Sequence, residues 1–246
     1  MTKPTAPPRS TTRSAAAAPP TSRPPAVAKP DRRHNILLAA EKLFATRGFH
    51  AVSIRDIAEE AQVPLALVGY YFGQKHELYH AIFEHWSGMI NERLGSLKQA
   101  LEDAEGDQLK ALAEAFIAPV IRLRASVEGE YYALLMTRGL SLQNEQEDAI
   151  IREFFDPMAA AFIDAFHRVL AAEFPGITQP QVAWCYQFAL GALLHHISDA
   201  RIERLSKGRN RPSDPAAMPL LVSFIAAGMR GAVQESMAAP KRKRRA

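Results

Sequence analysis

Residues 53–72 constrain the fold most, because their sequence, SIRDIAEEAQVPLALVGYYF, predicts two short helices joined by a tight turn. Ser53 is a favourable N-cap, since its hydroxyl can accept a hydrogen bond from a free backbone N–H of the first helical turn. Ile57 and Ala58 follow at helical spacing. Pro64 suits the start of a second helix, where its missing N–H costs nothing. The stretch is therefore predicted to be a helix-turn-helix unit.

The second helix of this unit has a face that suits close approach to another surface. Leu65, Ala66 and Gly69 have small or unfunctionalised side chains. Val68 and Phe72 lie four residues apart and are expected to pack inward. A DNA major groove is wide enough to admit such a helix. The pattern therefore indicates a DNA-binding element.

Seven positions in and after this unit follow a fixed order: Ser53, Ile57, Ala58, Ala61, Val63, Phe72 and Lys75. In this order the stretch resembles the helix-turn-helix of TetR-type bacterial transcriptional regulators. Three positions depart from that pattern: Gln62 replaces the usual turn glycine, Gly69 replaces a tyrosine that often contacts phosphate, and Tyr71 stands where histidine is common. We therefore expect Gln62 to adopt a left-handed backbone conformation at some cost.

The resemblance implies that the second helix is a recognition helix for double-stranded DNA. Arg55 could pair with guanine, or only with a phosphate or with Glu59. Arg32, at the start of the preceding helix, could bind a phosphate or remain solvated. The predicted DNA-binding residues are Arg32, Ser53, Arg55, Pro64, Leu65, Ala66, Tyr70, Tyr71 and Lys75.

The remaining sequence shows helical periodicity and no run of alternating β-branched residues. A first helix is expected from Arg32 to Gly48, with Glu41 opposite its apolar stripe, and a long helix from Lys75 toward Leu101. Further helices are expected at 107–126, 128–142, 145–173, 179–207 and 214–236. We therefore expect an all-α fold of about nine helices. It would comprise an N-terminal three-helix DNA-binding domain that contains the helix-turn-helix and a C-terminal helical bundle for ligand binding and dimerisation.

The two ends of the chain differ from its middle. Residues 1–30 are rich in Pro, Ala, Ser and Thr and are expected to be disordered. Residues 240–246 form a basic tail, and the formal net charge of +4 belongs to the ends, because residues 32–239 sum to −5. The tails could contact DNA phosphates or serve only as solubilising ends. We expect the DNA-binding domain at 31–90 and the effector-binding and dimerisation domain at 91–239.

Two prolines point to an effector pocket in the C-terminal bundle. Pro119 and Pro157 fall inside predicted helices and are expected to kink or interrupt them. Interrupted packing leaves space between helices. The candidate lining residues, each of which could instead be core, are Phe116, Tyr131, Tyr132, Met136, Phe155 and Phe162. Their aromatic character favours a small hydrophobic effector, such as a fatty acyl compound or a hydrophobic drug.

The last two long helices are more apolar than the cover of one core requires, and Gly191 and Gly228 permit close helix approach. Isologous pairs of this kind are the commonest oligomers. The resemblance likewise implies a homodimer formed through these helices. The predicted interface residues are Trp184, Phe188, Ala192, His195, Phe224 and Met229.

Motifs of enzymes are missing from the sequence, which has no phosphate-cradling glycine loop and no GxSxG elbow. His76, His80 and Glu84 lie four residues apart, and we expect an exposed polar face there instead of a metal site. The single cysteine, Cys185, is expected to be a small buried hydrophobe. We therefore expect no catalytic residue, no metal and no cofactor. Since no run of about 18 uninterrupted apolar residues occurs, we expect no membrane segment and a place in the cytoplasm, on the nucleoid.

These features together predict a transcriptional regulator, a repressor, that binds a palindromic operator as a homodimer and is released by a small hydrophobic effector. The alternative is an effector-independent DNA-binding protein that acts structurally or through a protein partner. A fully packed C-terminal bundle would favour that alternative.

Overall fold

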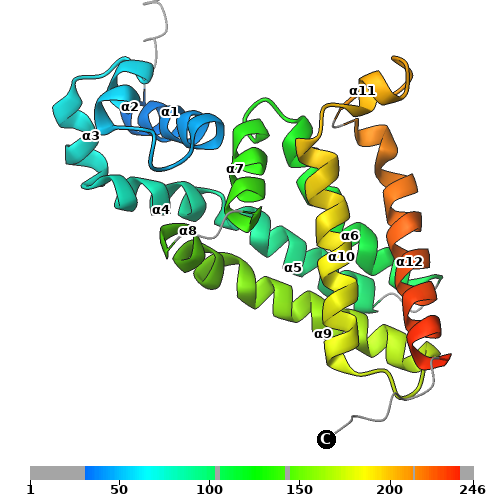
Figure 1. The fold of residues 1–246 in the computed structure, drawn as a ribbon. Coiled ribbons are helices and arrows are strands. Elements are labelled where there is room, and N and C mark those ends of the chain that lie inside the picture. The colour runs from blue at the N-terminus through cyan, green and yellow to red at the C-terminus, as the bar shows by residue number, and fades with distance from the viewer. Residues whose placement is uncertain (1–30, 103–105, 142–144, 213, 239–246) are drawn as a thin grey trace, which may run out of the picture. The chain divides into compact units, whose positions relative to one another are not determined.

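The computed structural model describes residues 31–102, 106–141, 145–212 and 214–238, and these residues form helices joined by turns, with no strand among them (Figure 1). The elements are α1 (Arg32–Arg47), α2 (Ile54–Glu60), α3 (Leu65–Phe72), α4 (Lys75–His85), α5 (Ser87–Glu102), α6 (Gln108–Ala125), α7 (Glu130–Ser141), α8 (Glu145–Ile150), the π-helical turn η1 (Ile151–Phe155), α9 (Asp156–Glu173), α10 (Gln179–Ser198), α11 (Ile202–Leu205), the 3-10 turn η2 (Pro215–Ala217) and α12 (Met218–Ala238). The prediction of an all-α fold is confirmed. The predicted tails at 1–30 and 240–246 lie outside the described residues.

The helix-turn-helix forms where local sequence predicts it. Ser53 caps α2 through a reciprocal pair of hydrogen bonds with Asp56, and Gly48 ends α1 with a positive φ of 86°. Pro64 occupies the cap position of α3, which begins one residue later. Gln62 has a φ of 54°, so the left-handed turn conformation expected of it is confirmed. Helices α2 and α3 pack on each other, and each contacts α1.

The expectation of one long helix from Lys75 to Leu101 is wrong, because the helix breaks at Trp86 between α4 and α5. The Trp86 indole nitrogen donates a 2.7 Å hydrogen bond to Glu41 of α1, and the indole ring stacks on Tyr132 of α7 at 5.2 Å. These partners lie far away in the sequence, so helical periodicity carries no signal of the break.

The two prolines have different effects. Helix α6 runs through Pro119 without a break, and Pro119 is buried. Pro157 lies in the first turn of α9, directly after the π-helical turn η1, so the segment expected as one helix from 145 to 173 is divided. The interruption predicted at Pro157 is confirmed.

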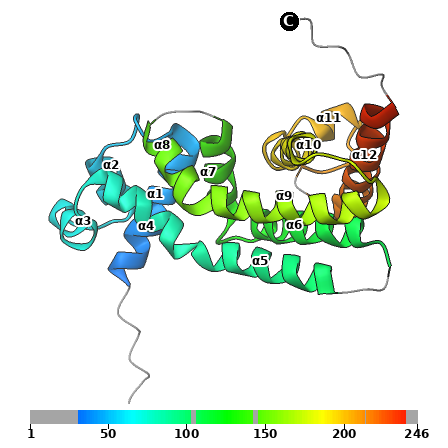
Figure 2. The same cartoon turned by 90° about the horizontal axis from the view of Figure 1, so that it is seen from below.

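The C-terminal helices pack in layers. Helices α5, α6 and α9 contact one another and run side by side in Figure 2. Helix α12 packs on α6, and α10 packs on both α9 and α12. Helix α7 contacts α1, α6 and α10, so α1 and the C-terminal helices share one core. The domain boundary predicted at residue 90 falls inside α5 and stays a prediction.

Candidate nucleic-acid interface and C-terminal surfaces

Helix α3 presents one face to solvent and the other to the core. Val68 and Phe72 are buried, as predicted, and Arg33 of α1 lies 4.9 Å from the centre of the Phe72 ring. Leu65 is exposed, and Tyr70, with 79% of its surface exposed, is among the most exposed apolar side chains described. The outward face of α3 therefore consists of short side chains flanked by a tyrosine, which suits insertion into a groove.

The predicted contacts on the outward face of α3 lie together at the surface. Pro64, Leu65, Ala66, Tyr70 and Tyr71 are all exposed, and the rings of the two tyrosines meet edge to face at 5.1 Å. The edge-to-face arrangement is one that aromatic pairs favour.

Ser53 and Arg55 lie at the start of α2, beside this face. The Ser53 hydroxyl caps the helix, and its hydrogen bonds lower the pKa of the Asp56 carboxyl. Arg55 is exposed, and among the described residues no ion pair joins it to Glu59. Its guanidinium is therefore available to an external anion or base.

Lys75, the first residue of α4, has an internal role. Its ammonium donates 2.9 Å hydrogen bonds to the carbonyls of Phe49 and Val52 and lies 4.4 Å from the centre of the Phe49 ring. Three donors are available on a lysine ammonium, and this pair of carbonyls fixes its position at the start of α4. Arg32, the other predicted basic contact, is exposed at the first position of α1.

Glu41 was expected on the outward face of α1, and this expectation is wrong: only 1% of Glu41 is exposed. Burial raises the pKa of its carboxyl to about 7, although hydrogen bonds from Trp86 and from the Tyr132 backbone work against that rise. A signal was present, since Glu41 follows Leu37 by four residues and precedes Phe44 by three, within the apolar spacing. Glu41 thus joins α1 to α7 and to the α4–α5 break.

The predicted effector-binding residues are mostly core. Phe116 and Phe162 meet at 5.2 Å between α6 and α9, and both are fully buried. Tyr132, Met136 and Phe155 are buried too. Tyr131 differs from these buried residues, because it lines a hollow of about 400 Å³ that is bounded by α1, α2 and the turn before α7.

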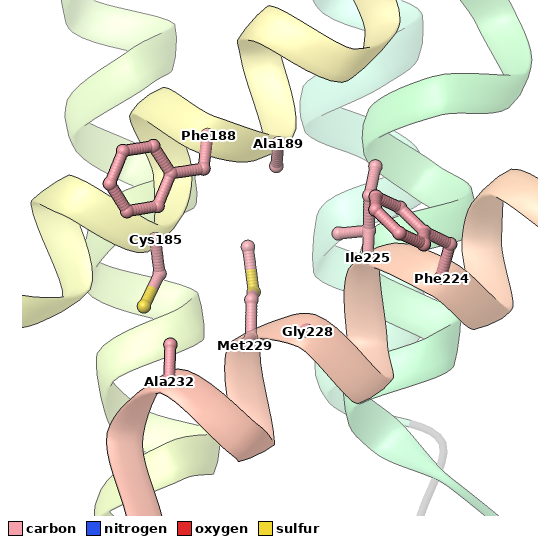
Figure 3. A pocket seen from close by; sticks show the side chains of 8 residues that line it. All are labelled: Cys185, Phe188, Ala189, Phe224, Ile225, Gly228, Met229 and Ala232. Carbon is pink, nitrogen blue, oxygen red and sulfur yellow. The ribbon is translucent and has the colours of Figure 1, made fainter. Parts of the chain in front are cut away.

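Helices α10 and α12 expose a row of large apolar side chains, which we call the α10/α12 surface: Trp184, Phe188, Leu220 and Phe224. Each of the four has more than 60% of its surface exposed. A hollow of about 150 Å³ lies between the two helices. In Figure 3, Phe188 lies on one side of it, Phe224 lies on the other, and the Met229 side chain extends between them. Of the predicted interface residues, Met229 is buried, whereas Ala192 and His195 line a second hollow of about 520 Å³.

Helix α12 is held to the bundle by ion pairs. Arg230 donates hydrogen bonds of 2.7–2.9 Å to Asp107, the cap of α6, and of 2.7 Å to Glu173 at the end of α9. These bonds raise the pKa of Arg230 and lower that of Asp107.

By length and composition alone the segment Pro215–Ala238 could cross a membrane, and 28% of its most apolar window is buried.

His80 of α4 contacts a neighbouring helix. His80 lies 3.0 Å from Glu153 of η1 and packs against the Phe154 ring at 5.1 Å, so it links two helices. Among the described residues, no group of three His, Cys, Asp or Glu side chains is arranged to hold a metal ion. Cys185 is buried, as expected, and burial raises the pKa of its thiol.

The protein has a helix-turn-helix head with an exposed second helix, and this head is joined to an all-helical C-terminal part. This arrangement is typical of a class of DNA-binding proteins. Residues 36–82 match the family model described as bacterial regulatory proteins, tetR family, and residues 114–228 match the model described as tetracyclin repressor-like, C-terminal domain. The chain belongs to the TetR family. The prediction of a TetR-type regulator is confirmed, and so is the prediction that it is not an enzyme, because the family consists of transcriptional regulators.

Similar proteins agree with this assignment. The chain is 31% identical over 90 residues to the transcriptional activator FasR of Mycolicibacterium smegmatis, covering 36% of this chain and 40% of FasR. It is 36% identical over 73 residues to the transcriptional repressor NicS of Pseudomonas putida, covering 30% of this chain and 34% of NicS. The chain thus matches less than half the length of these curated relatives.

Solved structures share the fold over most of the chain. PfmR of Thermus thermophilus has a TM-score of 0.54 at 21% identity and covers 79% of this chain and 95% of its own. FadR of Bacillus subtilis, solved in complex with stearoyl-CoA, has a TM-score of 0.53 at 16% identity and covers 79% of this chain and 98% of its own.

Proposed function

We propose that this protein is a transcriptional repressor that binds a palindromic operator as a homodimer, with α3 in the major groove. The observation that carries the proposal is the exposed outer face of α3, held on a capped helix-turn-helix whose core side is fully packed. Membership of the TetR family supports it. The site of action would be the cytoplasm, on the nucleoid.

The α10/α12 surface supports the homodimer. Its four large apolar side chains lie on the last two long helices, and a second copy would remove them from water. Two identical heads related by a two-fold axis would reach successive major grooves, about 34 Å apart. The same surface gives an account of the apolar composition of Pro215–Ala238 without a membrane.

The test is a selection of binding sequences from a random DNA library with the full chain, followed by fluorescence anisotropy on the enriched duplex. A palindromic consensus is expected. Arg55→Ala should weaken binding about tenfold or more and relax base preference at one position of each half-site, as loss of a bidentate contact does. Arg122→Ala, which removes the same charge from an exposed position of α6, is the matched control. Absence of any enriched sequence would refute the function.

A small hydrophobic effector would act by changing the spacing or tilt of the two heads. Support comes from the aromatic residues between α6, α7 and α9, and from the fold shared with FadR of B. subtilis, which was solved with stearoyl-CoA. The competing function, DNA binding without an effector, is favoured by the close packing of Phe116 on Phe162. Titration of fatty acids and their CoA esters into the operator complex separates the two, because an effector-independent protein stays bound to DNA throughout.

A further inference from the structure

Arg93 of α5 is buried, with only 3% of its surface exposed. Its Nη2 donates a 2.9 Å hydrogen bond to the Phe116 carbonyl of α6. The guanidinium carbon lies 4.9 Å from the centre of the Phe116 ring and 5.5 Å from that of Phe162 of α9. A cation is thus enclosed by α5, α6 and α9 between two aromatic faces.

This cation has no carboxylate partner among the described residues. None of the ion pairs there includes Arg93, and its Nε is buried without a hydrogen-bond partner. Burial lowers the pKa of the guanidinium to about 10, so it remains protonated at neutral pH. A buried charge is costly unless it is paired, and cation–π contacts offset only part of that cost. A structural role alone would be served better by an apolar side chain of similar size.

A second buried donor without a hydrogen-bond partner lies on α7, which packs against α6, the helix that carries the Arg93 partner Phe116. The Tyr132 hydroxyl of α7 is buried without a hydrogen-bond partner, and Tyr132 interacts electrostatically with Arg93. Burial raises the pKa of Tyr132, so its hydroxyl stays neutral and can donate. One guanidinium and one phenol are the donors that a carboxylate accepts best, since charge-assisted hydrogen bonds are the strongest in a dry interior.

We propose that Arg93 and Tyr132 bind the carboxylate of the effector, and that this effector is a free fatty acid whose apolar chain lies against Phe116 and Phe162. The inference rests on the proposed function, since it names the chemical class of the effector. One buried guanidinium neutralises one negative charge. A CoA ester carries several negative phosphate charges. Among the described residues around Arg93, no further buried cation is present to neutralise them, so the free acid fits this site and the CoA ester does not.

The same residues provide a route to the DNA-binding head. Tyr132 stacks on Trp86 at 5.2 Å, and Trp86 donates its indole N–H to Glu41 of α1. A carboxylate that draws the Tyr132 ring toward Arg93 disturbs this stack and the hydrogen bond beneath it. The orientation of α1 relative to α7 then depends on whether the acid is bound.

The test is isothermal titration calorimetry of the 246-residue chain with octanoate, dodecanoate and hexadecanoate, each compared with the alcohol of the same length. At least one acid is expected to bind about tenfold or more tightly than its alcohol, the factor that a charge-assisted hydrogen bond supplies. Dodecanoyl-CoA is expected to bind more weakly than dodecanoate. Equal affinity for acids and alcohols, or preference for the CoA ester, overturns the assignment.

Two variants locate the head group. Arg93→Met removes the charge with little change of volume, and it should keep or raise the midpoint of thermal unfolding while it abolishes the preference for the acid over the alcohol. Tyr132→Phe keeps the ring on Trp86 and should weaken acid binding about fivefold. Arg122→Gln, at an exposed position of α6, is the control and should bind as the wild type does. If Arg93→Met does not fold, the comparison of acid with alcohol on the wild-type protein still decides the question.

Calorimetry does not depend on DNA, so this inference and the proposed function can fail separately. Release of the operator by dodecanoyl-CoA but not by dodecanoate would overturn the head-group assignment and leave an effector-gated regulator standing. Acid binding that depends on Arg93, with no selected operator, would uphold the ligand site and refute the repressor.

Discussion

The indole nitrogen of Trp86 donates a 2.7 Å hydrogen bond to the Glu41 carboxylate, and this contact joins α1 to the break between α4 and α5. Because burial raises the pKa of Glu41 from 4.5 to about 7, the folded protein holds a proton that the unfolded chain releases at lower pH. Between pH 4.5 and about pH 7 the folded state binds more protons than the unfolded state does. The contribution of Glu41 to the free energy of unfolding therefore falls as pH rises through this range.

The variant Glu41→Gln should not lose stability in this pH range, because glutamine accepts the same hydrogen bond and carries no charge. The free energy of unfolding of the variant, relative to the wild type, should rise between pH 4.5 and about 7 by on the order of 3 kcal/mol. Urea unfolding across this pH range measures it. Glu59→Gln, at an exposed position of α2, serves as the control for the loss of one carboxyl at the surface. A parallel pH dependence in Glu41→Gln and the wild type would contradict the buried carboxylate.

Much of the N-terminal head could be predicted from the sequence because its signals are local. The Ser53 cap and the Gly48 stop each depend on residues within a few positions of one another, whereas the turn conformation of Gln62 was expected from the resemblance to TetR-type regulators, which usually have glycine there. The outward face of α3 followed from the inward spacing of Val68 and Phe72. These signals identified both the fold of the head and its candidate DNA-binding surface.

The contacts that join the head to the C-terminal helices could not be predicted in this way. The break at Trp86 is stabilised by Glu41 and Tyr132, each about 45 residues away. The burial of Arg93 depends on how α5, α6 and α9 pack, and a lone arginine in an amphipathic helix predicts an exposed side chain. Tertiary packing, which periodicity does not contain, decides these positions.

Gln62 offers a direct test of the turn. A non-glycine residue in the left-handed region costs on the order of 1 kcal/mol, and Gln62 is exposed, so its side chain contributes little packing. Gln62→Gly should therefore raise the free energy of unfolding by about 0.5–1 kcal/mol, measured by urea titration. Gln62→Ala keeps the strain and should have no such effect. Destabilisation by glycine would show that the side chain has a role in the folded state that its exposure conceals.

Arg230 tests the attachment of α12. The variant Arg230→Gln breaks the ion pairs with Asp107 and Glu173, and it should lower the free energy of unfolding by about 1 kcal/mol, since all three groups are about one-third exposed and solvent weakens their attraction. Because Arg230 lowers the pKa of Asp107, the contribution is present above the unfolded value of 3.8 and is lost as pH falls below it. Arg122→Gln, which breaks a single more exposed pair with Glu92, should change stability by less than about 0.5 kcal/mol. Equal effects of the two variants would show that the triad adds nothing beyond an ordinary surface pair.

Gly228 distinguishes a dimer formed through the α10/α12 surface from one formed elsewhere. A Cβ built on Gly228 or on Gly95 of α5 meets nothing within 4 Å in the chain, and both glycines are exposed inside helices. Leucine at either position should therefore leave the monomer intact and favour the helix by up to about 1 kcal/mol. At Gly228, beside Phe224 at the hollow of Figure 3, the new side chain would enter the space that a partner helix needs.

Analytical ultracentrifugation at several concentrations gives the comparison. Gly228→Leu should raise the dimer dissociation constant about tenfold or more, because overpacking a close helix contact costs about 1–3 kcal/mol. Gly95→Leu should leave the constant unchanged, and both proteins should show wild-type helical content by circular dichroism. A dimer that tolerates leucine at position 228 as well as at 95 would have its interface on another face, and the palindromic operator would then have to be read by heads with a different separation.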